Sequence, residues 1–530
     1  MNASLIEVTP PSFHDFRDAS PVASGVWRRS PLVLLLLASI LFAGCQPSSP
    51  DSDSRTDRAA SGDSGAGDSG ASDAATDSLA LPKIRLTVVD DAPLAEAVER
   101  HWNARSAGEV VVRNIASAEL LAAEHLNSDA VIYPSGLLGT LAERRWIVEF
   151  PMEPIDAAEY QRDEIFTLQR LHEPAWGKAI YAVSLGSPQL VLAYRRDIFE
   201  RLKVQPPTTW AEYQTLVEQL GDRALLGELA PAEDAAWTAT VEPNDQGWAA
   251  LMLLARAAPY ARHRSQFSTL FNVRTMQPLI DGPPFTRALD EMRMAIGQQP
   301  ATTPDGAWQR LVRGEAAMAV TWLPATTDKS SDDSDSAAAA NETGIVEPDA
   351  IGFAELPGAA EMYNFRNERW EPRGEDDEPR VPVVGIAGRL GSVSSVARSP
   401  RAAAALLAWI SGKEMSSVVS PASSATTMFR ESHRQQPSSW IAVRLSPQPT
   451  AAYAAAMSAA QNRPWSLDAL RIPGRERYLQ ALDEAAIASL AGDESSADSL
   501  KKTAAEWTKL TDQLGQESQR LAYRHSLGLD

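Results

Sequence analysis

The chain has 530 residues and a formal net charge of −20 at pH 7. Much of that charge comes from two low-complexity segments, residues 46–80 (net −5) and 327–349 (net −6), which leaves about −9 for the rest. No stripe of Lys and Arg with interleaved aromatic residues occurs, and this argues against nucleic-acid binding. With Cys45 as its single cysteine, the chain contains no internal disulfide and no cysteine-ligated zinc site.

The chain opens with the pattern of an export signal. An apolar stretch, residues 31–44, follows two arginines and ends at Cys45. It is shorter than the roughly 20 residues that a membrane-spanning helix needs, whereas a basic flank, an apolar centre and a small-residue exit are typical of a removed secretory signal. Residues 41–45 resemble a lipobox, with Phe42 where Leu is usual. We interpret residues 1–44 as leader and lipoprotein signal peptide and Cys45 as the lipidation site; the alternative is a soluble exported protein with an incidental cysteine.

Three polar segments are predicted to lie outside the core. Residues 45–80 consist mainly of Ser, Asp, Ala and Gly and are predicted to form a disordered acidic tether, because such a composition buries too little apolar surface to offset the ordering entropy. Residues 327–349 are predicted to be a disordered insertion on the same grounds. A third polar run, residues 366–380, is predicted to be an inserted surface loop.

The folded body begins at about residue 81 and is long enough for two domains. Its first part alternates β-like and helical patterns, which predicts a parallel, helix-covered sheet. The expected elements are strand 84–89, helix 94–102, strand 110–112, helix 118–125 and strand 129–133. Ligands of such sheets lie beyond the carboxyl ends of the strands. Asp90, Asp91, Tyr133 and Ser135 are therefore candidate ligand-binding residues.

Six segments, taken in order, resemble family 1 extracellular solute-binding proteins, the maltose-binding-like receptors of ABC importers. In one of them, residues 206–213 (Pro-Pro-Thr-Thr-Trp-Ala-Glu-Tyr), Thr209 is expected to cap a helix and Glu212 to complete a capping box. The other segments are residues 176–199, 313–322, 351–358, 399–409 and 472–478.

The resemblance implies an α/β, two-lobed periplasmic-binding-protein-like fold, in which each lobe is a helix-covered, mainly parallel sheet and a hinge joins the lobes. It places lobe one at residues 81–188 plus 322–418 and lobe two at residues 189–321 plus 419–530. Such lobes close on a ligand by hinge bending.

The resemblance also suggests which aromatic residues contact ligand. By similarity to sugar-binding members, Tyr133, Trp248, Trp322 and Tyr478 fall at cleft positions, where aromatic rings stack on the apolar faces of sugars. Asp90 and Asp91 follow the first strand, where a hydroxyl-binding carboxylate often lies.

The implied function is an extracytoplasmic solute receptor without a cofactor. It would act as a lipid-anchored monomer that captures a small solute, a sugar or oligosaccharide, and delivers it to the permease subunits of an ABC transporter. The alternative on the same fold is a non-transport sensor or surface binding protein. Polyamine, phosphodiester and iron ligands stay open as solutes.

An enzyme is not expected from the sequence. The seven His residues show no metal-site spacing, and no phosphate-binding loop occurs. Adjacent strand-end residues such as Asp90 and Asp91 point apart and cannot flank one glycosidic bond.

Overall fold

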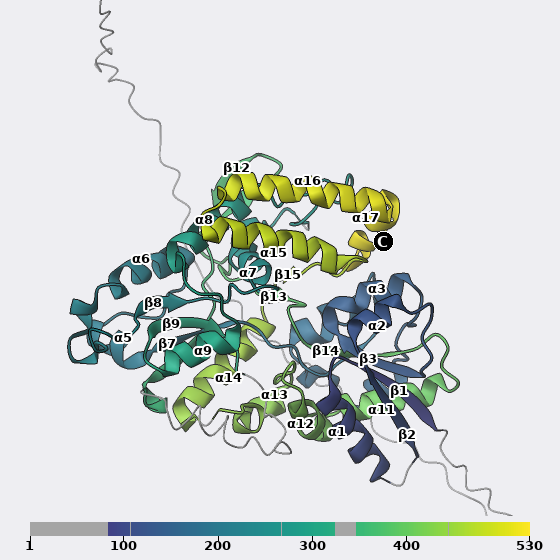
Figure 1. Ribbon diagram of the computed structural model, residues 1–530. Coiled ribbons are helices and arrows are strands. Elements are labelled where there is room, and N and C mark those ends of the chain that lie inside the picture. The colour runs from purple at the N-terminus through teal and green to yellow at the C-terminus, as the bar shows by residue number, and fades with distance from the viewer. Residues whose placement is uncertain (1–82, 106–107, 267, 324–345, 444, 530) are drawn as a thin grey trace, which may run out of the picture. The chain divides into compact units, whose positions relative to one another are not determined.

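The computed structural model describes residues 83–105, 108–266, 268–323, 346–443 and 445–529 (Figure 1). By internal contacts the chain divides into Met1–Thr76 and Asp77–Asp530, and the described residues all belong to the second unit. The leader, Cys45, the predicted tether and most of the predicted insertion lie outside the described residues. Within the described ranges, no helix is long and apolar enough to cross a membrane.

The first sheet has five strands in the order β2-β1-β3-β14-β6. The predicted parallel arrangement of the first three strands is confirmed, because Leu86 of β1 lies beside Val112 of β2 and Ala130 of β3 in parallel register. β14 runs antiparallel to β3 and β6. The strands are β1 Ile84–Val89, β2 Val110–Ile115, β3 Ala130–Pro134, β6 Val183–Ser184 and β14 Arg389–Val393. The helices that accompany them are α1 Ala92–Asn103, α2 Ser117–Ala122, α3 Leu138–Glu143, α4 Glu153–Asp156, α11 Pro400–Ser411 and α12 Lys413–Val419.

The second sheet has four strands in the order β10-β7-β9-β8. Only β8 and β9 are parallel, since β7 runs antiparallel to both of its neighbours, so the sheet is less parallel than expected. β10 falls in the range expected for lobe one, yet it pairs with β7, from Ile351 beside Arg195 to Glu355 beside Val191. The strands are β7 Val191–Arg195, β8 Thr238–Val241, β9 Ala316–Thr321 and β10 Ile351–Glu355.

The remaining elements include helices α5 Arg196–Leu202, α6 Trp210–Leu220, α7 Ala249–Ala261, α8 Pro283–Ile296, α9 Pro304–Val312, α13 Glu431–Arg434, α14 Pro447–Gln461, α15 Arg475–Ala491, α16 Ser496–Leu514 and α17 Gln516–Ser526. Three two-stranded ladders are β4 Ala175–Trp176 with β5 Ala179–Ile180, β11 Glu361–Asn364 with β12 Arg369–Pro372, and β13 Val383–Val384 with β15 Leu467–Asp468. The short helical turns are η1 Ser135–Leu137, η2 Ala158–Tyr160, η3 Arg162–Glu164, η4 Leu168–His172, η5 Arg223–Leu229, η6 Pro348–Ala350, η7 Ser420–Ala422 and η8 Pro437–Trp440.

The start of α6 follows the local sequence signal. Thr209 Oγ1 accepts a hydrogen bond from Glu212 N at 3.2 Å, and the Glu212 carboxylate accepts one from Thr209 N at 3.3 Å. The predicted capping box is therefore confirmed.

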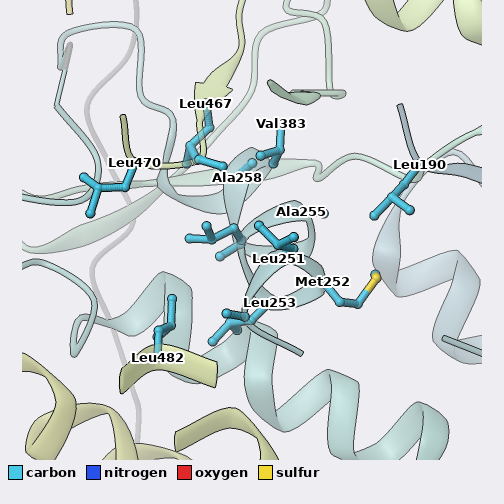
Figure 2. Packing of buried hydrophobic residues seen from close by; sticks show 14 of the residues in the cluster. Leu190, Leu251, Met252, Leu253, Ala255, Ala258, Val383, Leu467, Leu470 and Leu482 are labelled. Atoms are coloured by element: carbon cyan, nitrogen blue, oxygen red, sulfur yellow. The ribbon is translucent and has the colours of Figure 1, made fainter. Parts of the chain in front are cut away.

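Helix α7 is the buried centre of one core cluster. All of its residues are buried, as expected for a helix that is apolar on every side. Figure 2 shows its apolar side chains beside Val383 of β13, Leu467 of β15 and Leu482 of α15. Its one charged residue, Arg256, is fully buried and pairs with Glu242 at 2.5 Å, which offsets the cost of desolvating both charges.

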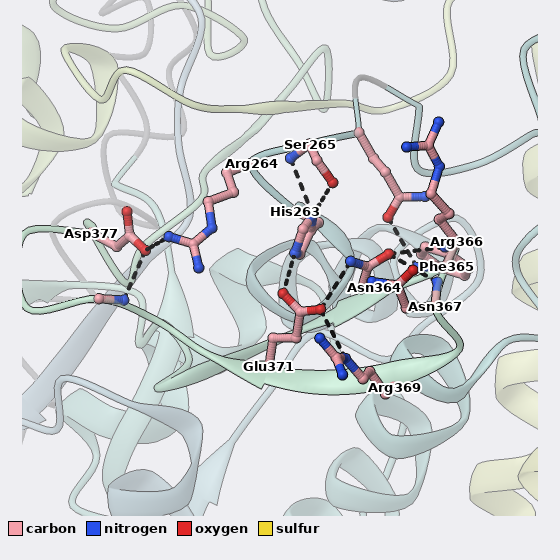
Figure 3. Close-up of polar contacts among 12 residues, drawn as sticks. His263, Arg264, Ser265, Asn364, Phe365, Arg366, Asn367, Arg369, Glu371 and Asp377 are labelled. Atoms are coloured by element: carbon pink, nitrogen blue, oxygen red, sulfur yellow. Dashed lines mark hydrogen bonds and ion pairs between the residues drawn. The ribbon is translucent and has the colours of Figure 1, made fainter.

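The polar run 366–380 departs from the loop prediction, because part of it forms β12 and pairs with β11. Glu371 of β12 accepts hydrogen bonds from His263 at 3.1 Å, Asn364 at 3.0 Å and Arg369 at 3.1 Å (Figure 3). These bonds, that of His263 first, lower the pKa of Glu371 to about 2. Because the Glu371 carboxylate accepts three hydrogen bonds, it holds the β11–β12 hairpin in place. The composition of the polar run does not reveal this arrangement.

The predicted insertion at 327–349 also extends a few residues too far. Residues 346–349 are described: Val346 is buried, and its N–H donates to Val312 O at 3.2 Å. Turn η6 follows directly and leads into β10. Residues 346–349 therefore belong to the folded body.

Candidate functional site

A pocket of about 640 Å³ lies between the start of α7 and one face of α15. Its volume is within the range of small-molecule sites. Positions three and four apart along α15 recur in its wall, as expected for a single helix face. The pocket is lined by Gln246, Gly247, Ala250, Leu251, Ile386, Arg475, Glu476, Leu479, Gln480, Asp483, Glu484, Ile487, Ala488 and Asp493. We call it the α7–α15 pocket.

Arg475 at the start of α15 is fixed by backbone carbonyls. Its Nε donates to Leu470 O at 2.9 Å and its Nη2 to Gly385 O at 3.3 Å. The guanidinium lies against Gly136, where an added Cβ would come within 2.6 Å of Arg475 Cζ. Arg475 can occupy this position only because residue 136 is a glycine, which has no side chain.

Asp483 holds the start of α7 against α15. Its carboxylate accepts hydrogen bonds from Gly247 N at 2.7 Å and Ala250 N at 2.9 Å, two backbone donors at a helix N-terminus. Burial raises the pKa of Asp483, and these backbone donors act in the opposite direction. Gly247 has φ of +85°, a left-handed conformation that side chains disfavour.

The lining combines an apolar wall with excess negative charge. Its apolar side chains are Ile386, Leu251, Leu479 and Ile487. Four of its lining residues are acidic and one, Arg475, is basic. Such a surface suits a neutral solute with hydroxyl groups, or a cation, better than an anion.

Two predicted ligand-binding residues lie together beside this pocket. Trp248 directly follows Gly247, and Trp322 directly follows β9; their ring centroids are 4.8 Å apart with an interplanar angle of 64°. Both indoles are half-buried. They form an edge-to-face pair next to the pocket without belonging to its lining.

Ser135 adjoins the pocket indirectly. Its hydroxyl donates to Ala387 O at 3.2 Å, and the preceding residue, Ile386, lines the pocket. The end of β3 thereby supports the segment that forms one wall.

Asp90 and Asp91 follow β1 as predicted, but both carboxylates bind neighbouring protein groups. Asp90 accepts from Ser117 N at 2.9 Å. Asp91 caps α1 through Leu94 N at 3.2 Å and forms a buried ion pair with Arg389 at 2.8 Å. Neither lines the α7–α15 pocket.

Tyr133 and Tyr478 are fully buried. The Tyr133 hydroxyl lies 2.7 Å from Ser392 Oγ, and the Tyr478 hydroxyl lies 2.9 Å from Thr511 Oγ1. Burial raises the pKa of Tyr133 and of Tyr478. Both residues face the core rather than the pocket.

The sequence reasoning missed the neighbours of Tyr478 that do line the pocket. Leu479 and Gln480 follow it on α15, and each step along a helix turns the side chain by about 100°. The available signal was the recurrence of polar residues at 476, 480 and 484 along an otherwise Ala-rich helix. It marks the exposed face that forms the wall.

The described residues contain no group of three or more His, Cys, Asp or Glu able to hold a metal ion. The buried carboxylates instead have protein donors, as at Asp91 and Asp483.

A family model described as "Bacterial extracellular solute-binding protein" matches residues 110–420, more than half of the chain. The chain belongs to this family, and the resemblance inferred from its sequence motifs is confirmed. Members of this family are extracytoplasmic binding proteins rather than enzymes. No curated protein matches the chain.

Solved structures show the same two-lobed fold. The sugar-binding protein MalE from Xanthomonas citri has a TM-score of 0.59 and 15% identity, covering 82% of this chain and 98% of that one. An ABC transporter solute-binding protein from Agrobacterium radiobacter K84, in complex with ribitol, has a TM-score of 0.55 and 16% identity. The match covers 82% of this chain and 99% of that one. A solute-binding protein from Agrobacterium vitis S4, with bound D-mannitol, has a TM-score of 0.53 and 14% identity. The match covers 82% of this chain and 99% of that one. At these identities the likeness concerns the fold alone.

Proposed function

We propose that this protein captures a small polyhydroxylated solute, a sugar or sugar alcohol, in the α7–α15 pocket and delivers it to an ABC-type permease. The observation that carries the proposal is the helix face of α15, which places Gln480 and Glu484 beside Leu479 and Ile487. Carboxylates and amides hydrogen-bond hydroxyl groups, while apolar side chains cover the carbon skeleton. The ribitol and D-mannitol bound to two proteins of this fold support the choice of solute.

The tryptophan pair extends the proposed site. Trp248 and Trp322 are half-buried, so each leaves part of its ring open to a solute that reaches beyond the pocket. Of the residues expected from the sequence, we retain these two, with Ser135 as a support of the wall. Tyr133, Tyr478, Asp90 and Asp91 act in this proposal as structural residues, because their polar groups are engaged within the protein.

The two sheets are proposed to mark the two lobes. Lobe one comprises the first sheet with α1, α3 and α11, and lobe two the second sheet with α7, α8, α15 and α16. Residues 351–355 then belong to lobe two, because they pair with β7. The crossings expected near residues 187 and 415 are kept in this proposal, whereas the crossing expected near residue 322 moves to the segment between β10 and β14, residues 356–388.

The membrane attachment is proposed from the sequence. Cys45 would carry the lipid, and residues 46–80 would tether the solute-binding body. Such a protein would act as a monomer on the periplasmic side of a bacterial membrane, within reach of its permease.

Isothermal titration calorimetry of the full chain with ribitol, D-mannitol and maltose tests the solute class. We expect Gln480→Ala to weaken binding of the solute that the wild type binds, whereas the matched control Gln219→Ala, on the exposed face of α6, leaves it unchanged. Equal affinities of the Gln480→Ala and wild-type proteins would place the solute elsewhere.

Trp322→Ala tests the extended site. A buried aromatic anchor at a binding site is worth roughly 1 to 4 kcal/mol of affinity. We expect a loss within that range and a smaller change in stability than the roughly 3 to 5 kcal/mol that truncation of a core Trp costs. Unchanged affinity with a large loss of stability would make Trp322 a packing residue.

A cationic solute is the second candidate. Four acidic lining residues and one basic residue leave the pocket with excess negative charge, which favours a polyamine. Spermidine in the same titrations distinguishes the two: binding that weakens steeply with added salt, without polyol binding, would favour the cation. Solute uptake by cells that carry or lack the permease distinguishes transport from a sensor role.

A further inference from the structure

The start of α7 borders the α7–α15 pocket with its backbone. Gly247 and Ala250 both line the pocket, and Gly247 has no side chain, so its main chain forms part of the wall. A Cβ added at Gly247 would meet nothing within 4 Å beyond its chain neighbours among the described residues, so open space adjoins it. The first N–H groups of a helix have no acceptor within the helix and carry the positive end of its dipole. Such a position attracts an anionic group.

Asp483 of α15 already occupies this position. Its Oδ2 accepts a hydrogen bond from Gly247 N at 2.7 Å, and its Oδ1 accepts one from Ala250 N at 2.9 Å. Asp483 itself lines the pocket, although only 3% of it is exposed. The two amides stabilise its ionised form, against the opposing effect of burial on its pKa. A carboxylate of the protein thus stands where the carboxylate of a ligand would bind.

The other charges of the lining act in the same direction. Glu476, Glu484 and Asp493 are further carboxylates, and Arg475 is the one basic residue among the described lining residues. The Arg475 guanidinium already donates to two backbone carbonyls. An anionic solute would therefore face four carboxylates, and the amides at the start of α7 would already be bonded to one of them. Such like-charge contacts are strongly unfavourable.

A hydroxyl group meets the same carboxylate as a hydrogen-bond acceptor. The two oxygens of a carboxylate have about four lone-pair positions, and the amides of Gly247 and Ala250 take up only part of them. The remainder can accept from solute hydroxyl groups, whereas an ionised carboxyl group of a solute has no proton to donate. A site built to bond a hydroxyl group discriminates strongly against a compound that lacks it. Asp483 therefore distinguishes a sugar alcohol from the sugar acid of the same size.

We propose that Asp483 determines the specificity of the α7–α15 pocket: its carboxylate fills the anion position at the start of α7, so that the pocket binds neutral polyols and excludes the corresponding sugar acids. This proposal rests on the proposed function, because it assumes a solute in that pocket. It adds the residue that sets the solute class, and it implies that removal of one carboxylate opens the pocket to anions.

Calorimetric titration of the full chain with D-mannitol and with D-mannonate measures this discrimination. The two compounds differ only at one end, where mannonate has a carboxylate and mannitol a hydroxymethyl group. We expect the wild type to bind mannonate at least about tenfold more weakly than mannitol. Asp483→Asn, which removes the charge and keeps the size, should reduce this preference roughly fivefold or more.

Asp493→Asn is the matched control, because it removes the same charge from the lining at a position beyond the end of α15. We expect it to change the preference by less than about twofold, since a charge farther from the solute is screened more strongly. Equal binding of the two compounds by the wild type, or an unchanged preference in folded Asp483→Asn, overturns the proposal. An equal reduction in Asp493→Asn overturns it too, because net charge rather than the position of Asp483 would then set the preference.

Formate tests the anion position without any solute. Asp483→Ala removes the carboxylate that bonds the two amides at the start of α7. We expect sodium formate to raise the melting temperature of Asp483→Ala above its value in sodium chloride of equal concentration. The wild type should show no such difference, because its own carboxylate fills the position. Absence of the difference in folded Asp483→Ala overturns the proposal.

The formate experiment also separates this proposal from the proposed function. Formate stabilisation of Asp483→Ala in a protein whose wild type binds no polyol would contradict the proposed function and still support the anion position that Asp483 fills. Melting temperatures show whether each variant is folded. If Asp483→Ala does not fold, the titrations of Asp483→Asn decide.

Discussion

Replacement of Glu173 by Gln should change how the stability of the protein depends on pH. Glu173 is 1% exposed, and both oxygens of its carboxyl group lie 2.6 Å from the Ser187 hydroxyl, which donates to them. The nearby Arg471 guanidinium donates to the backbone carbonyl of Glu173 rather than to its carboxylate. Burial raises the pKa of Glu173 to about 7, against the opposing effects of Ser187, Ser135 and Arg471.

The sign follows from proton binding. The pKa of an unperturbed glutamate is 4.5, so the folded protein keeps the Glu173 proton over a pH range in which the unfolded chain has lost it. The free energy of unfolding therefore falls as pH rises from about 4.5 to about 7, and this contribution is constant above that range. With about 1.4 kcal/mol for each pKa unit, the loss amounts to about 3 kcal/mol. Gln carries no such penalty, because it does not ionise.

Urea unfolding at pH 5 and pH 8 measures the effect. We expect Glu173→Gln to have nearly the wild-type stability at pH 5 and to exceed it by as much as about 3 kcal/mol at pH 8. Glu119→Gln is the control, because Glu119 is an exposed carboxylate paired with Arg113 on the surface. A difference between Glu173→Gln and wild type that is equal at both pH values would refute the reasoning, since it would show that Glu173 does not change its protonation in this range.

Three further outcomes are expected. Cys45→Ser should release the protein from the membrane fraction without unfolding it, and partition that survives a high-salt wash would contradict the lipoprotein proposal. Glu242→Gln should lower the free energy of unfolding by roughly 3 to 5 kcal/mol, measured by urea unfolding, because it leaves the fully buried Arg256 without its counter-charge. Gly136→Ala should displace Arg475, since the new Cβ would come within 2.6 Å of its guanidinium carbon, and should change solute affinity in calorimetry; unaltered affinity would show that Arg475 is not needed for binding.

Local signals in the sequence were sufficient for part of the fold. The alternation of apolar strands and helices predicted the parallel β1, β2 and β3, and the Thr209 and Glu212 spacing predicted the capping box of α6. Both depend on residues close together in the chain, where backbone geometry fixes which groups meet. The motif order likewise led to the correct family.

Part of the candidate site was also accessible from the sequence. Trp248 and Trp322 were selected by similarity to sugar-binding members of the family, and their ring centroids lie 4.8 Å apart. Tyr478 was selected by the same similarity, but it is buried, and Leu479 and Gln480 line the pocket instead. An aromatic side chain suits the core as well as a ligand, so residue type alone could not decide between them.

Only the tertiary structure decided which distant segments meet. The pairing of β10 with β7 joins residues about 160 apart in the sequence, and one pocket is lined by Gly177, Arg262 and Arg471 together. The sequence determined the local elements and the family, since these depend on neighbouring residues. The folded chain decided burial and the sites, since these depend on contacts across the chain.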